Sequence, residues 1–111
     1  MSTPGFGNHE SVRRWLESRA GLWGIRSIND DLLEWLERFC REVDKEPDAL
    51  IDECLRPATD SDSLVLRTRA RRRYIDAIER FEQETASRAA ANVVRSFFIH
   101  NGVAMNPTVL R

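Results

Sequence analysis

Residues 85–102 read "TASRAAANVVRSFFIHNG", which combines the apolar period of a helix with a stop signal at its end. Apolar residues recur there at spacings of three and four, and this places them on one face of a helix. We expect that face to be buried. Its members are Ala86, Ala89, Ala90, Val93, Val94, Phe97 and Phe98. Asn101 and Gly102 predict a left-handed C-cap, after which Val103 and Met105 pack against the core.

The other face of this helix carries Arg88, Asn92 and Arg95, at spacings i, i+4 and i+7. Arginine suits guanine and asparagine suits adenine, so the stripe is a candidate reader of base edges in DNA. The alternative is an ordinary solvated face on a packed helix. Arg95 also lies near the C-terminus of the helix, where a cation is favoured in any case.

The same helical period recurs along the chain, and no strand alternation competes with it. We expect a first helix over about 9–19, broken at Gly21, and a second from a cap at Asn29 to the break "VDKEP". A third runs from Pro47 to Pro57, a fourth over about 62–84 and a fifth over about 86–100. The predicted fold is all-α, a compact bundle of four to five helices. Residues 1–8 are expected to form a flexible tail and 9–106 the helical domain.

Composition indicates one globular domain in 111 residues, with a net charge of −1. Residues 1–60 carry a net charge of −5 and residues 61–111 a net charge of +4. No apolar run reaches the roughly 18 residues of a membrane span, and no signal peptide precedes the first helix. Cys40 and Cys54 fall on apolar faces and are expected to be buried, reduced thiols. We therefore expect a cytoplasmic protein with no membrane partner.

The densest charge cluster is "RTRARRRY", residues 67–74. Its arginines are Arg67, Arg69, Arg71, Arg72 and Arg73. Charges of one sign this close repel, so an acidic neighbour or an anionic partner is expected. Nucleic acid is one hypothesis. Pairing with the acidic first half is the other, and its candidate carboxylates are Glu42, Asp44, Glu46, Asp48 and Asp52.

Catalytic and cofactor motifs are sparse. His9 and His100 are the only histidines, and neither has a Cys, Asp or Glu partner at metal-ligand spacing. There is no Gly-rich phosphate loop and no Walker motif, and no nucleophile–base set can be assembled. We expect no metal, no cofactor, no small-molecule substrate and no enzyme activity in this chain alone.

The order of motifs resembles the N-terminal core-binding (SAM-like) domain of tyrosine recombinases, also called phage integrases. "SINDDLLEWLERFCREVDKEPDALIDECL" is similar to the family's opening helix, with Leu36 and Phe39 in its Leu-x-x-Phe ending, and "EPDALI" to the start of the next. "RRRYIDAIERFEQETASRAAANVVRSFFIHNGVAMNP" resembles the last two helices. The likeness covers about residues 9–107. Where the family often has basic residues early in its last helix, this chain has "AAA" at residues 89–91.

The resemblance implies a helical domain that clamps duplex DNA opposite a catalytic domain, which would follow the linker at residues 107–111. The family's Arg, His-x-x-Arg and nucleophilic Tyr are not matched here, and Tyr74 lies on an apolar stripe, so we expect it in the core. Expected partners are duplex DNA and other recombinase protomers, in the cytoplasm at the nucleoid. The alternatives are a helical protein-interaction module and a standalone regulator of a recombinase.

Overall fold

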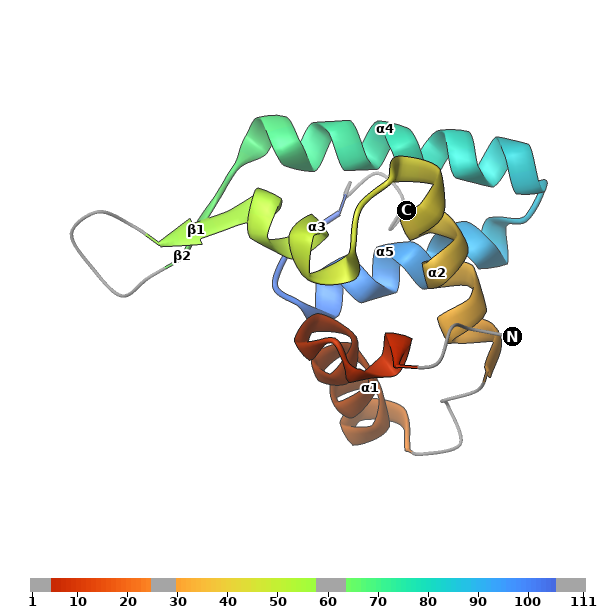
Figure 1. Cartoon of the computed structure of the whole chain (residues 1–111), viewed down its shortest axis with the longest axis horizontal. Helices are drawn as coiled ribbons and strands as arrows, with labels where there is room; N and C mark the ends of the chain where they lie inside the picture. Colours follow the sequence, from red (N-terminus) through yellow and green to blue (C-terminus); the bar gives the residue numbers. More distant parts are fainter. Residues whose placement is uncertain (1–4, 25–29, 58–63, 106–111) are drawn as a thin grey trace.

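The computed structural model describes residues 5–24, 30–57 and 64–105. Its elements in chain order are η1 (Phe6–Asn8), α1 (Glu10–Trp23), α2 (Asp30–Val43), α3 (Pro47–Cys54), β1 (Leu55–Pro57), β2 (Leu64–Leu66), α4 (Thr68–Thr85) and α5 (Arg88–His100). The all-α bundle of five helices predicted from the sequence is confirmed (Figure 1). None of the helices in these segments is long and apolar enough to cross a membrane.

Helix α5 lies at the centre of the bundle and packs on α1, α2 and α4 (Figure 1). Its buried residues are Ala90, Ala91, Val94, Phe97 and Phe98. The predicted face is therefore rotated slightly. Ala89 is exposed, Val93 is half-buried, and Ala86 lies before the helix rather than in it. Ala91 enters the core because α5 is covered from more than one side, which a single-stripe pattern does not anticipate.

Aromatic contacts join α5 to its neighbours. The rings of Trp15 and Phe97 meet edge to face, with centroids 5.7 Å apart, and connect α1 to α5. The Tyr74 ring lies 5.6 Å from that of Phe98 and connects α4 to α5. Tyr74 is 5% exposed, which confirms its predicted place in the core. Contacts of this geometry add roughly 0.5–1.5 kcal/mol each beyond the area they bury.

The end of α5 is closed by the predicted cap. The Gly102 N–H donates to the carbonyl of Ile99 and the Val103 N–H to that of Phe98, with φ of 91° at Gly102, as in a Schellman motif. The buried side chain of Asn101 donates to the carbonyls of Ser11 and Phe97, at 3.0 and 2.9 Å. The cap therefore also attaches the end of α5 to the first turn of α1. Val103 and Met105 are buried, as predicted.

The described part of the predicted tail, residues 5–8, instead contains η1 with a buried Phe6, and three further helix boundaries differ from the sequence prediction. Helix α1 continues through Gly21 to Trp23, and α3 ends at Cys54 instead of Pro57. Helix α4 starts at Thr68 instead of residue 62, because Leu64–Leu66 pairs antiparallel with Leu55–Pro57. The Arg67 N–H extends this pairing by donating to the carbonyl of Cys54. A short run of consecutive apolar residues fits a strand as well as a helix, so periodicity alone does not separate the two. The strand pair projects from the bundle beside the start of α4 (Figure 1).

The first turn of α1 is capped by a side chain from α3. Asp48 accepts hydrogen bonds from the backbone N–H and the hydroxyl of Ser11, at 2.9 and 2.5 Å, and lies 3.5 Å from His9 Nδ1. Burial alone would raise the pKa of Asp48. The hydrogen bonds from Ser11 and the charge of His9 outweigh it and hold that pKa below its ordinary value. Asp48 therefore provides the acceptor of a helix N-cap for α1, although it belongs to another helix.

Asp48→Asn is expected to lower the free energy of unfolding by roughly 0.5 kcal/mol near pH 7, because asparagine can still accept the hydrogen bonds of a cap but loses the negative charge that faces His9 and the N-terminus of α1. A depressed carboxyl pKa contributes stability that is present above the unfolded value of about 3.9 and is lost as pH falls through the folded value. The difference between variant and wild type should therefore shrink between about pH 5 and pH 3. Urea denaturation across that range measures it. Asp52→Asn, at an exposed carboxylate of the same helix, is the matched control and should have little effect.

Ala86→Gly is expected to stabilise the fold by about 1 kcal/mol. Ala86 ends α4 at φ 53° and ψ 33°, a left-handed conformation that costs a residue with a Cβ but not glycine. Its N–H donates to the carbonyl of Gln83 and the next N–H to that of Glu82, so the conformation is required by the cap. Thermal denaturation measures the change. The same substitution at exposed Ala89, inside α5, should destabilise, and a gain there or a loss at Ala86 would contradict the argument.

Candidate nucleic-acid interface

The arginine cluster, defined as Arg67, Arg69, Arg71, Arg72 and Arg73, surrounds the start of α4. Helix α4 turns one face to the core, where Ala70, Tyr74 and Ile78 are buried. The opposite face is left to solvent, and four of the five arginines are exposed there, with Arg71 half-buried at the edge. Arg67 precedes the helix as its N-cap residue and does not lie within it, although the predicted fourth helix included it.

The members of the arginine cluster differ in what they already bind. Arg71 donates from Nε to the backbone carbonyl of Ala104, which fixes the chain after α5 to α4. Arg72 lies 3.6 Å from Asp76 on its own helix, a weak exposed pair. Among the described residues, the guanidinium groups of Arg67 and Arg69 have no ion pair or hydrogen bond. These two and Arg72 are therefore the side chains most available to an anionic partner.

Arg73 belongs to a small charge network centred on Glu53 of α3. Glu53 accepts a hydrogen bond from Arg73 Nη2 at 3.2 Å and one from the buried hydroxyl of Tyr74 at 2.7 Å. Its second oxygen lies 3.4 Å from Nζ of Lys45, in the loop before α3. Burial raises the pKa of Glu53, but Tyr74, Lys45 and Arg73 lower it by more, so the carboxyl is held ionised. Burial and the Glu53 carboxylate in turn raise the pKa of Tyr74.

Sequence reasoning missed this network. The acidic partners predicted for the cluster do not contact it within the described part of the chain; Asp48, for example, pairs with His9. Glu53 was not among the predicted partners, although it follows Asp52 in the sequence. Helix α3 turns Glu53 toward α4 and leaves Asp52 exposed. Lys45 is the only lysine in the sequence, which makes it noticeable. Its position in the sequence does not show, however, that it lies near residues 67–73.

The stripe on α5 is organised by Glu82 of α4. Glu82 lies 3.2 Å from Nη2 of Arg95 and 3.6 Å from Nε of Arg88, and Arg95 Nη1 donates to Asn92 at 2.9 Å. Arg88, Asn92 and Arg95 therefore do lie together, as predicted. The Arg95 side chain is only 13% exposed, whereas that of Arg88 is 82% exposed. Arg95 holds α4 to α5, and Arg88 and Asn92 remain open to solvent.

The two groups of predicted binding residues lie at opposite ends of α4. Helices α4 and α5 run antiparallel, so Arg88 sits near the end of α4 while the arginine cluster sits at its start (Figure 1). The rise of about 1.5 Å per residue places the two groups roughly 20 Å apart. They therefore form two separate positive points instead of one continuous patch, and a ligand that reached both would have to be an extended anion.

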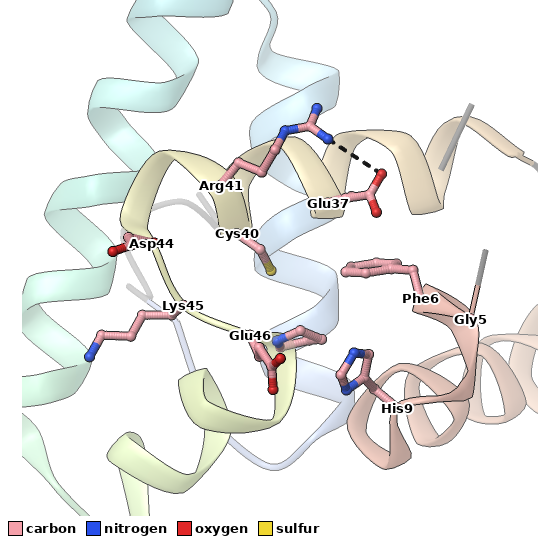
Figure 2. A pocket seen from close by; sticks show the side chains of 10 residues that line it. Gly5, Phe6, His9, Glu37, Cys40, Arg41, Asp44, Lys45 and Glu46 are labelled. Atoms are coloured by element: carbon pink, nitrogen blue, oxygen red, sulfur yellow. Dashed lines mark ion pairs between the residues drawn. The ribbon is translucent and has the colours of Figure 1, made fainter. Parts of the chain in front are cut away.

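A pocket on another side of the molecule shows no catalytic arrangement. It has a volume of about 440 Å³ and lies between η1 and the end of α2, with Phe6 and His9 facing Cys40 and Glu46 (Figure 2). Burial and the charges of Glu37 and Glu46 raise the pKa of the Cys40 thiol to about 12, which makes it a poor nucleophile. Cys40 and Cys54 are both buried free thiols, as predicted. No cluster of metal-ligating side chains occurs within residues 5–24, 30–57 and 64–105.

Comparisons of the chain with protein-family models, with curated proteins and with solved structures found no match. The likeness to the recombinase domain therefore stays a prediction from the sequence motifs. Any inference about function therefore depends on the residues of this chain. Its most distinctive feature is the exposed arginine cluster at the start of α4.

Arg95→Met is expected to lower the free energy of unfolding by about 2 kcal/mol, because the partly buried carboxylate of Glu82 loses the closer and more buried of its two arginine partners. Arg88→Met should change it by less than about 0.5 kcal/mol, since exposed pairs contribute little. Urea denaturation of both variants measures the contrast. Equal effects would show that Arg95 is as much a surface residue as Arg88.

Proposed function

We propose that this chain binds duplex DNA as the core-binding (SAM-like) domain of a tyrosine recombinase and carries none of the catalytic residues. The observation that supports the proposal best is the exposure of Arg67, Arg69 and Arg72 around the start of α4. Arginine in such a cluster neutralises phosphates and releases their counterions. The ordered recombinase-like motifs over residues 9–107 supply the second line of support.

In this proposal the arginine cluster contacts one part of the DNA backbone and Arg88 with Asn92 contacts another. Their separation of roughly 20 Å along α4 exceeds the width of one groove, about 12 Å for the major groove, so the two groups would meet phosphates on different sides of it. Arg95 is committed to Glu82, which leaves Asn92 as the better candidate for base contact on α5. We expect weak binding by the isolated domain, with a dissociation constant in the nonspecific range of about 10⁻⁴–10⁻⁶ M.

The alternative is a helical protein-interaction module, with an acidic partner in place of DNA. Two exposed apolar residues, Leu22 on α1 and Ile99 on α5, are compatible with such a role. Single exposed apolar side chains are common on ordinary surfaces, however, and favour no partner. A standalone regulator of a recombinase would use the same surface to bind either DNA or a protein, so the contacts expected for it are those of the other two hypotheses.

Fluorescence anisotropy with a labelled duplex tests the proposal across a salt series. We expect Arg69→Glu combined with Arg72→Glu to abolish measurable binding, and milder Arg69→Gln with Arg72→Gln to reduce the salt slope by about 1.8, since each phosphate contact contributes about 0.9. Both positions are exposed, and Arg71 is avoided because it holds the carbonyl of Ala104.

The control reverses the charge of one arginine elsewhere, so it is compared with Arg69→Glu alone. Arg13→Glu alters an exposed arginine of α1, away from the arginine cluster, and should retain most of the binding. Absence of binding by the wild type at about 50 mM salt, or equal losses in Arg69→Glu and the control, would overturn the proposal. Binding of an acidic polypeptide in place of duplex DNA would favour the protein-interaction module.

A further inference from the structure

Glu53 has the surroundings of a bound phosphate. An arginine, a lysine and a tyrosine hydroxyl converge on its two oxygens, at 3.2, 3.4 and 2.7 Å. Arg, Lys and Tyr side chains are common donors to phosphate oxygens in nucleic-acid complexes. The carboxylate is held ionised by these same donors. The Glu53 carboxylate thus occupies a cluster of donors that would also suit a phosphate group from a ligand.

We propose that Glu53 is an intramolecular competitor for phosphate at a site formed by Lys45 and Arg73, and that it limits the affinity of the arginine cluster for nucleic acid. The inference deepens the proposed function, on which it rests. It adds Lys45 to the interface and assigns Glu53 a regulatory part.

The charges at the site favour such competition. Two cations surround one carboxylate, so the site keeps a surplus positive charge while Glu53 is in place. The side chains of Arg73 and Lys45 are 68% and 48% exposed, and that of Glu53 is 26% exposed. A phosphate can therefore approach the two cations from solvent, but it meets the negative charge of Glu53 when it does. Like charges at that range repel, so the carboxylate weakens the contact.

The position of the site relative to the arginine cluster supports the same reading. Arg73 lies one helical turn from Arg69, so the two are neighbours on the exposed side of α4. Lys45 enters from the loop between α2 and α3, and its ion pair with Glu53 places it beside Arg73. Contact with a DNA backbone at Arg69 would bring a nearby phosphate to the Lys45–Arg73 pair, because phosphates repeat along the strand at short intervals.

Glu53→Gln removes the competing charge, and Asp52→Asn is the matched control. Both lower the negative charge of α3 by one, but Asp52 is exposed and makes no ion pair in the described part of the chain. We expect Glu53→Gln to bind a labelled duplex about tenfold more tightly than Asp52→Asn, with a salt slope steeper by about 0.9 for one added phosphate contact. Adding Lys45→Gln to Glu53→Gln should cancel most of the gain.

Circular dichroism checks the fold of each variant. Loss of the carboxylate leaves the Tyr74 hydroxyl with a weaker acceptor, so Glu53→Gln combined with Tyr74→Phe is the second variant, in which both partners are changed together. It should show the same direction of change in affinity. Affinity of Glu53→Gln equal to or below that of Asp52→Asn, in either background, would overturn the proposal and show that Glu53 only positions its neighbours.

Inorganic phosphate distinguishes failure of this inference from failure of the proposed function. Titration of phosphate is followed by NMR at the Arg73 Nε–H. A saturable shift in Glu53→Gln, absent from wild type and from Asp52→Asn, supports the anion site even if no variant binds DNA, and that result would overturn the proposed function alone. Without any shift in Glu53→Gln, the site is no phosphate site and the inference fails.

Discussion

The fold depends on how α5 is covered. Ala90, Ala91 and Val94 in its first half and Phe97 and Phe98 in its second are fully buried, which takes more than one apolar stripe. The adjacent pairs widen the buried face, so α1, α2 and α4 can each pack against a different part of it. Phe97 meets Trp15 of α1, and Phe98 meets Tyr74 of α4.

That arrangement determines which charges reach solvent. Once α4 turns Tyr74 toward Phe98, Arg69, Arg72 and Arg73, which precede it, lie on the outer surface. Antiparallel packing of α4 and α5 then sets Glu82 against Arg95, and Glu82 also pairs with Arg88, whose side chain stays mostly exposed. The polar links follow the apolar packing: Glu53 reaches α4 because α3 packs beside it, and Asp48 reaches α1 for the same reason. The charged surface is therefore a consequence of the core.

The sequence predicted the parts of the fold that repeat over several turns. The core position of Tyr74 on the apolar stripe of α4 and the cap at Gly102 were both found where the pattern placed them. Short segments were less predictable. Residues 64–66 read as the start of a helix, but they pair with β1, because three apolar residues carry no periodicity of their own. The rotation of the α5 face that buries Ala91 comes from tertiary packing and has no local signal.

The candidate site shows the same division. That Arg88, Asn92 and Arg95 share a face follows from helical spacing, and the structure bears it out. Their different exposure does not follow, since it depends on Glu82, which belongs to another helix. The pairing of Arg73 with Glu53 and the approach of Lys45 likewise join segments that are far apart in sequence. Spacing in the sequence shows which residues share a face of one helix, whereas the ion pairs that decide which charges stay exposed form between different helices.

A chain with a net charge of −1 exposes clustered arginines here, and some of its carboxylates are fixed among cations. Asp48 caps α1, Glu82 holds two arginines of α5, and Glu53 holds Arg73 and Lys45. Each of the last two places one negative charge among two positive ones, so a surplus of positive charge stays near the surface while the pairs remain intact.

A single carboxylate is a point charge, whereas duplex DNA presents a negative charge about every 1.7 Å of its axis and releases counterions when it is bound. Such a polyanion can compete with internal carboxylates that a single small anion would not displace. The ion pairs would therefore oppose binding of small anions more strongly than binding of an extended one, and this selectivity would suit the nucleic-acid contact that we propose.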